Sequence, residues 1–285
     1  GETTKKINEN KEIIEIKKIL GLESNKTYKT TDELRYNKIL FMTDQDLDGS
    51  HIKGLCINLF EWLWPSLLHI DGFLGFMNTP ILKATKSSKM IQFYNEQEYE
   101  LWKLSNNDGK GWSIKYYKGL GTSTGKEFKE YFKDKKTMDI VLGEKDKETI
   151  DMVFNKKKAD FRKEWLSKYE RCNVLDTLKT KVTLGDFIDR EMIHFSKYDC
   201  DRSIPNMMDG LKVSQRKILY SAFKKNLVNE IKVAQFSGYV SEHSGYHHGE
   251  SSLNGAIVNM AQDFVGSNNI NILMPNGQFG TRLQG

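Results

Sequence analysis

Apolar side chains recur every three or four residues in several stretches of the chain, which is the spacing of helices with one buried face. The helices predicted in this way span about residues 8–21, 50–67, 96–104, 125–133, 211–225 and 251–265. Gly21 and Gly266 follow the last apolar positions of two of them and predict where those helices end. Short apolar or alternating runs predict strands near residues 39–42, 73–83, 90–95 and 112–117.

The order of these elements predicts two domains of different class. Strands and helices alternate up to about residue 135, which is typical of an α/β domain. Residues 135–200 are charged and helical in character, and they predict a connecting arm. After Pro205, helices are separated by short polar turns that carry basic residues, as in a helix-turn-helix or winged-helix module. A length of 285 residues also favours two domains.

Composition narrows the class of protein. The chain is 38% hydrophobic and holds only 4 prolines, which argues against a Pro-rich disordered protein. No apolar run approaches the roughly 18 residues of a membrane span, and we expect neither a membrane segment nor a signal peptide. The 3 widely separated cysteines fit neither a disulfide framework nor a zinc pattern, so we expect a reducing compartment. A net charge of +5 permits nucleic-acid binding without arguing for it.

An acidic loop directly follows the first predicted strand. Asp44, Asp46 and Asp48 alternate there, so in extended chain they share one side and repel one another unless a cation neutralises them. An EF-hand loop would need Glu where Leu55 stands, and calcium sensing is rejected. Capping of the next helix by Asp48 or Ser50 is the plainer alternative, but one carboxylate is enough for a cap. We prefer a Mg²⁺ site for phosphoryl transfer.

A glycine-rich loop, KGLGTSTGK (118–126), follows the strand predicted near 112–117. Its glycines lack the Walker A spacing, and Glu127 follows Lys126 where that motif needs Ser or Thr. The dinucleotide fingerprint fails as well, because Thr124 occupies the position of its third glycine. Neither ATP nor a dinucleotide is indicated. A tight strand-to-helix turn and a phosphate-contacting loop are equally supported.

Basic residues gather in two segments of the chain. Those between residues 156 and 171 are interrupted by acids and are explained by a solvated helix face. Those between residues 205 and 235 face only Asp209 and Glu230, which is better evidence for binding to a phosphate backbone. The members of this second group are Lys212, Arg216, Lys217, Lys224, Lys225 and Lys232.

A histidine pair, His247 and His248, precedes the helix predicted over residues 251–265. The start of a helix presents free N–H groups and the positive end of its dipole, which suits a phosphate. A zinc protease is excluded because the chain has no H-E-x-x-H. Binding to phosphate oxygens and a hydrogen-bonded structural role are about equally supported.

Taken together, these segments resemble the DNA breakage core of the type II DNA topoisomerases in their eukaryotic form. The segments that carry the resemblance follow one another along nearly the whole chain. They are ILFMTDQDLDGSHIKG (39–54), YYKGLGTSTGKEFKEYF (116–132), FRKEWL (161–166), RSIPNMMDGLKVSQRKILY (202–220), KVAQFSGYVSEHSGYHHGESSL (232–253), AQDFVGSNN (261–269) and PNGQFGTRLQG (275–285).

The resemblance implies an α/β Toprim domain over residues 1–165, incomplete at its N-terminus, a linker over 166–203, and a mainly helical winged-helix DNA-cleavage domain over 204–285. It also implies a nuclear, homodimeric enzyme that uses Mg²⁺ and ATP to pass one double-stranded DNA through another, changing supercoiling and catenation. A tyrosine attacks a DNA phosphate in that reaction. ATP belongs to the complete enzyme and not to this chain.

The resemblance also implies residue roles. Asp44 bridges the two positions of a two-metal Mg²⁺ site, Asp46 holds the second, and Asp48 supports both. Arg216 and His247 position or stabilise the scissile phosphate. The residues expected to contact DNA are Arg162, Lys163, Lys212, Tyr246, His248, Lys118 and Arg282.

The chain departs from the family pattern in several places. We expect the catalytic Arg-Tyr pair beyond Gly285, a further Toprim glutamate before Gly1, and the ATPase region outside the chain. Val213 and Ser214 stand where Pro-Gly is common. A fragment that binds duplex DNA weakly and does not cleave it is therefore expected. One alternative is a catalytically inert DNA-binding scaffold with a Toprim fold. Another Toprim enzyme, such as a primase or nuclease, is disfavoured by the segments after Pro205.

Overall fold

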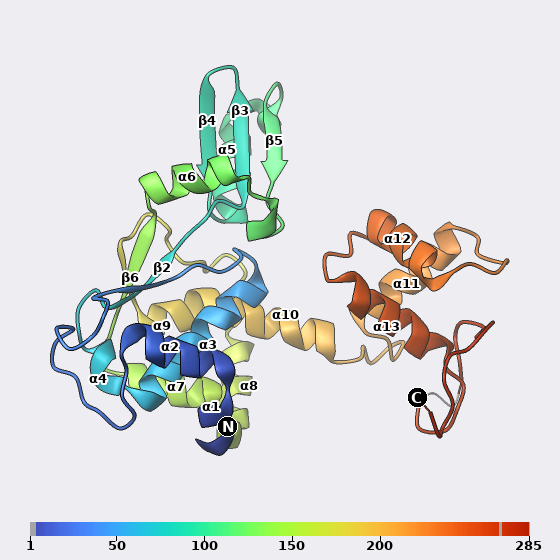
Figure 1. Ribbon diagram of the computed structural model, residues 1–285. Helices are drawn as coiled ribbons and strands as arrows, with labels where there is room; N and C mark the ends of the chain where they lie inside the picture. The colour runs from blue at the N-terminus through green and yellow to red at the C-terminus, as the bar shows by residue number, and fades with distance from the viewer. Residues whose placement is uncertain (1–3, 268–269, 285) are drawn as a thin grey trace. The chain divides into compact units, whose positions relative to one another are not determined.

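The computed structural model describes residues 4–267 and 270–284. The chain divides into two compact units, Gly1–Lys197 and Tyr198–Gly285, and each is described by itself. The first unit mixes strands and helices, and the described part of the second is helical, so the predicted mixed α/β character is confirmed (Figure 1). No helix among the described residues is long and apolar enough to cross a membrane.

A four-stranded sheet with the order β1-β2-β6-β7 forms the centre of the first unit. Its strands are β1 (Ile39–Phe41), β2 (Leu74–Met77), β6 (Thr137–Val141) and β7 (Lys181–Thr183). β1 and β2 run parallel, as do β6 and β7, and β2 pairs antiparallel with β6. All residues of β2 are buried, as expected for a central strand covered on both faces.

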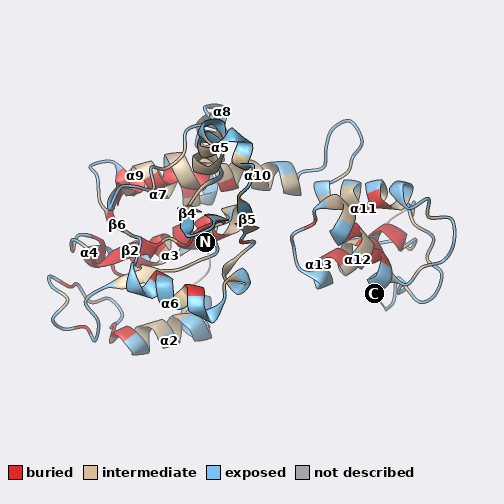
Figure 2. Ribbon diagram, turned by 90° about the horizontal axis from the view of Figure 1, so that it is seen from above, coloured by how far each residue is buried: buried red, intermediate tan, exposed pale blue. Residues whose placement is uncertain are grey.

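The helices around this sheet belong to the same unit, except that the last of them, α10 (Ile193–Ser203), continues past its end at Lys197 (Figure 1). They are α1 (Thr4–Glu9), α2 (Lys11–Leu20), α3 (Leu47–Leu63), α4 (Pro65–Leu68), α7 (Asp146–Phe154), α8 (Ala159–Ser167), α9 (Leu184–Phe187), a π-helix at Ile188–Met192 and α10. The buried residues of α3, α7 and α9 form one hydrophobic core with those of β2 and β6, and buried residues are coloured red in Figure 2. The predicted stop of α2 is confirmed, because Gly21 adopts the left-handed conformation there with a φ of 77°.

A second, three-stranded antiparallel sheet has the order β4-β3-β5. Its strands are β3 (Leu82–Lys86), β4 (Lys89–Phe93) and β5 (Ser113–Tyr116), accompanied by α5 (Glu96–Ser105) and α6 (Gly125–Lys133). Ala84 and Phe93 are buried in its small core, against which Trp102 and Trp112 pack. β5 and α6 lie close to the ranges predicted from the sequence, and the loop between them carries the glycine-rich motif.

Part of the segment predicted as a linker, residues 166–203, packs into the first unit. β7 extends the main sheet beside β6, and the following Leu184 and Phe187 are almost completely buried. The Phe187 ring lies 5.1 Å from the ring of Phe76 in β2. Leu184, Phe187, Ile188, Met192 and Phe195 recur at helical spacing and are all buried, so a pattern for this helical segment was present in the sequence but was not used. The boundary between the compact units falls between Lys197 and Tyr198.

The second unit is built on three helices, α11 (Val213–Lys224), α12 (Val233–Ser244) and α13 (Glu250–Ala261). Each contributes to one core, for example through Ile218, Val240 and Leu253. The sequence predicted α11 and α13 but not α12, and α13 ends before Gln262 rather than at Gly266. Within 198–267 and 270–284 there is no strand, and the name winged helix stays a prediction.

A core substitution tests whether the residues after β7 belong to the fold. Phe187→Ala should lower the free energy of unfolding by about 3–5 kcal/mol, because it leaves a cavity against β2. Leu178→Ala is the matched control, since Leu178 is 91% exposed. Both are measured by urea denaturation followed by circular dichroism. Equal, small effects of the two substitutions would contradict a contribution of Phe187 to the core.

Candidate functional site

The acidic loop connects β1 to α3 and caps that helix. The Asp46 carboxylate accepts a 2.7 Å hydrogen bond from the backbone N–H of Gly49, so Asp46, and not Asp48 or Ser50, is the N-cap. Burial raises the pKa of Asp46, and repulsion from the carboxylates of Asp44 and Asp48 acts in the same direction. α3 begins at Leu47, earlier than the sequence predicted.

Asp44 contacts the glycine-rich loop. The backbone N–H of Leu120 donates a 2.6 Å hydrogen bond to Asp44 Oδ1. Gly119 lies so close that an added Cβ would stand 2.9 Å from the Asp44 carboxyl carbon. Gly49 is tighter still, since a Cβ there would meet the Asp44 carbonyl oxygen at 1.9 Å. The structure thus brings together two motifs that lie 76 positions apart in the chain.

The donor chemistry of the acidic loop fits a hard divalent cation. Thr43 Oγ1 is buried beside Asp44 and has no hydrogen-bond partner, which leaves an oxygen in the loop without a partner. Nowhere in the described part of the chain do three Asp, Glu, His or Cys side chains converge on one ion position. Mg²⁺ is commonly held by one or two protein carboxylates together with water and phosphate oxygens. The loop fits that arrangement, and does not form a cage made of protein ligands alone.

A buried ion pair anchors the first turns of α3. Lys53 is only 1% exposed, and its Nζ lies 3.0 Å from Glu191 Oε1 in the π-helix. Ser50 Oγ donates to the same oxygen at 2.9 Å. Sequence reasoning missed this support, because Glu191 is 138 positions from Lys53 and stands in a segment without a motif.

Glu127 contacts Tyr117 and Thr124 on either side of the glycine-rich loop. Its role was not predicted from the sequence. Its carboxylate is 8% exposed and accepts hydrogen bonds from Lys115 Nζ, Tyr117 Oη, and both the N–H and Oγ1 of Thr124. Burial opposes its ionisation, but these donors outweigh burial and lower the pKa of Glu127 to about 2. The Thr124-x-x-Glu127 capping box was the signal available in the sequence.

In the second unit, Arg216 on α11 forms a two-point pair with Asp209. Arg216 Nε and Nη2 donate to Asp209 Oδ2 and Oδ1 at 3.0 and 2.9 Å, and Nη2 also reaches the Leu211 carbonyl oxygen at 3.3 Å. The Leu211 backbone N–H and the Arg216 guanidinium both lower the pKa of Asp209. In the sequence, Asp209 was noted only as one of the two acidic residues within the basic segment 205–235.

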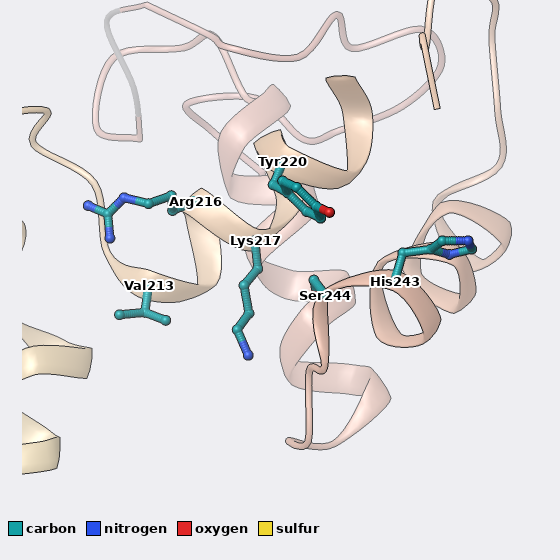
Figure 3. Close-up of a pocket in the computed structure, with 6 residues that line it drawn as sticks. All are labelled: Val213, Arg216, Lys217, Tyr220, His243 and Ser244. Atoms are coloured by element: carbon teal, nitrogen blue, oxygen red, sulfur yellow. The ribbon is translucent and has the colours of Figure 1, made fainter. Parts of the chain in front are cut away.

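Arg216 also borders a cavity of about 350 Å³ between α11 and α12 (Figure 3). Its lining residues are Val213, Arg216, Lys217, Tyr220, His243 and Ser244. Lys217 Nζ donates to the Gly245 carbonyl oxygen at 2.9 Å, and burial lowers the pKa of Lys217. This bond ties α11 to the turn that carries the histidine pair.

The histidine pair lies in the turn before α13, and both side chains are exposed. His248 Nε2 lies 3.2 Å from Tyr198 Oη, and its ring meets Tyr246 edge-on at 5.3 Å. Tyr246 itself is buried in the core of the unit. Lys212 precedes α11 and lines a second cavity of about 330 Å³ that reaches α13.

The other residues predicted to contact DNA are dispersed. In the first unit, Arg162 Nη1 donates to the carbonyl oxygens of Met152 and Asn155 and closes the end of α7. Lys163 pairs with Asp160 at 2.8 Å on the exposed side of α8. Lys118 and Arg282 are exposed, the first at the start of the glycine-rich loop.

Known families match both units. Residues 77–200 match the family described as the C-terminal associated domain of TOPRIM, and residues 202–285 match the family of the A subunits of DNA gyrase/topoisomerase IV. The chain is 55% identical to DNA topoisomerase 2 of Arabidopsis thaliana, over 99% of this chain and 20% of that protein. It is 52% identical to DNA topoisomerase 2 of Saccharomyces cerevisiae, over 97% of this chain and 20% of that protein.

A solved structure matches as well. It is the crystal structure of the Plasmodium falciparum topoisomerase II DNA-binding, cleavage and re-ligation domain, with a TM-score of 0.83 and 51% identity over 98% of this chain and 39% of that chain. The fold therefore matches that of a DNA topoisomerase cleavage region. The chain belongs to the type II DNA topoisomerases in their eukaryotic form, which confirms the predicted family. It spans about a fifth of the length of these curated relatives.

The acid sensitivity of the fold should depend on Glu127. Its pKa falls from 4.5 to about 2 on folding, so its stabilising effect is complete above about pH 4.5 and is lost as the pH falls toward 2. Thermal melts of the chain and of Glu127→Gln should therefore converge over this range. Glu130→Gln is the control, because the Glu130 side chain is 44% exposed. A gap between the melting temperatures that does not change with pH would contradict the assignment.

Proposed function

We propose that the chain is part of an Mg²⁺-dependent, ATP-coupled enzyme that passes one DNA duplex through another and so changes supercoiling and catenation. The observation that carries the proposal is the contact between the acidic and glycine-rich loops at Asp44, in a chain that belongs to the type II topoisomerases. The matched solved structure is named for DNA binding, cleavage and re-ligation, which supports the same chemistry here.

In this proposal Asp44 and Asp46 hold Mg²⁺, and Asp48 supports them. When bound, the two ions supply positive charge that stabilises the attacked phosphate and the departing 3′-oxygen. Backbone N–H groups of the chain hold two of these carboxylates in position. The Leu120 N–H orients Asp44 through Oδ1, and the Gly49 N–H orients Asp46. Both aspartates are thus held by backbone donors, which do not change with pH.

The scissile phosphate is assigned to Arg216 and His247. The pair with Asp209 uses Nε and Nη2 of Arg216, so among the described contacts Nη1 is the end of the guanidinium that faces a phosphate. His247 stands in the exposed turn before α13, where the helix dipole favours an anion. Lys217 holds this turn through Gly245 and acts as a positioning residue.

The remaining DNA contacts are proposed for Lys118, Arg162 and Lys163 in the first unit, and for Lys212, Tyr246, His248 and Arg282 in the second. Tyr246 is only 7% exposed and packs edge-on against His248, so we propose that it takes part in the DNA contact together with His248. We assign the names Toprim and winged helix to residues 1–165 and 204–285, and a linker to 166–203. The complete protein is proposed to be a nuclear homodimer that binds ATP outside this chain.

The second candidate is a DNA-binding scaffold without catalysis. It is favoured by one observation, namely that no three potential ligands converge on an ion position within the described ranges. The two candidates differ in whether the acidic loop binds a divalent cation, so metal binding decides between them.

DNA binding should depend on salt and on Arg216. A duplex labelled with fluorescein should bind the chain with an affinity that falls as KCl rises from about 50 to 200 mM. Arg216→Ala should lower the slope of log K against log salt by about 1, because one phosphate contact is lost. Lys5→Ala removes a cation that is 82% exposed on α1 and should leave the slope unchanged. Equal slopes for all three proteins would remove Arg216 from the interface.

Metal binding should depend on the aspartates of the acidic loop. Mn²⁺, used as an EPR probe for Mg²⁺, should bind the chain more weakly after Asp44→Asn or Asp46→Asn, by at least the roughly 10–100-fold that is typical for loss of a partner one step removed from the metal, while DNA binding is retained. Asn keeps an acceptor oxygen and remains a good cap. Asp263→Asn, on the second unit, is the charge control. In the complete enzyme, Asp44→Ala and Asp46→Ala should abolish cleavage. Unchanged Mn²⁺ affinity in the Asn variants would support the scaffold.

A further inference from the structure

The glycine-rich loop has a mechanical connection to the acidic loop that the proposed function does not explain. Its first residues reach Asp44 through the Leu120 N–H. Gly119 is extended there, with φ of 174° and ψ of −179°, so it is required by lack of space and not by backbone conformation. A Cβ on Gly121 would have nothing within 4 Å. Of these two glycines, only Gly119, next to Asp44, has no room for a side chain.

Both ends of this loop are fastened to one carboxylate. Tyr117, which precedes the loop, donates its hydroxyl hydrogen to Glu127 Oε1. Thr124, which ends the loop, donates its N–H and its hydroxyl hydrogen to Oε2 at 2.8 and 3.0 Å. The two oxygens of Glu127 thus hold the two ends of the loop at a fixed separation. The position of the Leu120 N–H therefore depends on where Glu127 places these ends.

The charge of this carboxylate is balanced from the three-stranded sheet. Lys115 Nζ lies 2.8 Å from Oε2, and Lys83 Nζ lies 3.6 Å from Oε1. A buried carboxylate without such partners would bind a proton and lose part of its acceptor capacity. The lysines therefore keep both oxygens available for Tyr117 and Thr124. The second sheet acts on the acidic loop through this ion pair.

We propose that Glu127 is a positioning residue for metal binding, which fixes the glycine-rich loop so that the Leu120 N–H holds Oδ1 of Asp44 and leaves Oδ2 for the cation. The inference rests on the proposed function of Asp44 as a metal ligand. Partners of this kind, one step removed from the metal, typically change affinity by about 10–100-fold.

The test measures Mn²⁺ binding by EPR on the chain of 285 residues. Glu127→Gln should weaken binding about tenfold. Glu130→Gln is the control. Glu130 lies one turn further along α6, and its Oε2 is 3.9 Å from Lys83 Nζ, so this substitution should change Mn²⁺ affinity less than about twofold. Gly119→Ala should weaken binding in the same way as Glu127→Gln, whereas Gly121→Ala should not.

A second readout follows the hydrogen bond itself. In the absence of metal, the Leu120 amide of the wild-type chain should show a downfield proton shift and slow exchange with solvent, as expected of a short bond to a carboxylate. In Glu127→Gln, the chemical shift of the Leu120 amide proton should move toward that of a solvent-exposed amide. Wild-type Mn²⁺ affinity and an unchanged Leu120 amide in Glu127→Gln would overturn the inference.

The remaining outcomes are also decisive. If Glu127→Gln does not fold, Tyr117→Phe takes its place, since it removes a single donor from Oε1. Weaker Mn²⁺ binding with a moved Leu120 amide in Tyr117→Phe supports the inference, and no change in either contradicts it. If the wild-type chain binds no Mn²⁺ through Asp44, the proposed function fails. The Leu120 amide then still shows whether Glu127 positions the loop.

Discussion

Repulsion among the carboxylates of Asp44, Asp46 and Asp48 is the constraint around which the first unit is arranged. Three negative charges next to one another require compensation, and in the structure two of them receive it from backbone N–H groups. One donor comes from the first turn of α3 and the other from a loop 76 positions away. The main sheet supplies the strand that presents the carboxylates, and the three-stranded sheet supplies the loop that orients one of them.

Ion pairs that each contain one buried member hold these loops in place. Lys53 with Glu191 fixes the start of α3, and Lys115 with Glu127 fixes the start of α6. Such a pair contributes little net stability compared with apolar packing, but removing the partner of Lys53 or of Glu127 leaves a buried charge unpaired. Such pairs are therefore suited to defining position. In this molecule each pair contacts residues next to a loop that the proposed chemistry uses, and not the proposed metal ligands themselves.

The sequence revealed what local pattern and motif can reveal. The acidic loop, the helix ending at Gly21 and the family were predicted, since each depends on neighbouring residues or on ordered motifs. Lys53 with Glu191 was not predicted, because the pair joins segments 138 positions apart. The burial of Phe187 was not predicted either, because its helical spacing with Leu184, Ile188 and Met192 was not used. The Glu127 capping box was visible, but Glu127 was used only to exclude a nucleotide motif. The site residues and domain boundaries stay predictions.

The close approach of Gly49 and Gly119 to Asp44 limits how this sequence can diverge. Any side chain at these two positions would meet the backbone or carboxyl group of Asp44. Gly121 and Gly125 share the same motif, yet a Cβ on either would meet nothing within 4 Å. Glycines that look equivalent in the printed sequence therefore face unequal selection. Gly121 and Gly125 have room for a side chain, whereas Gly49 and Gly119 do not.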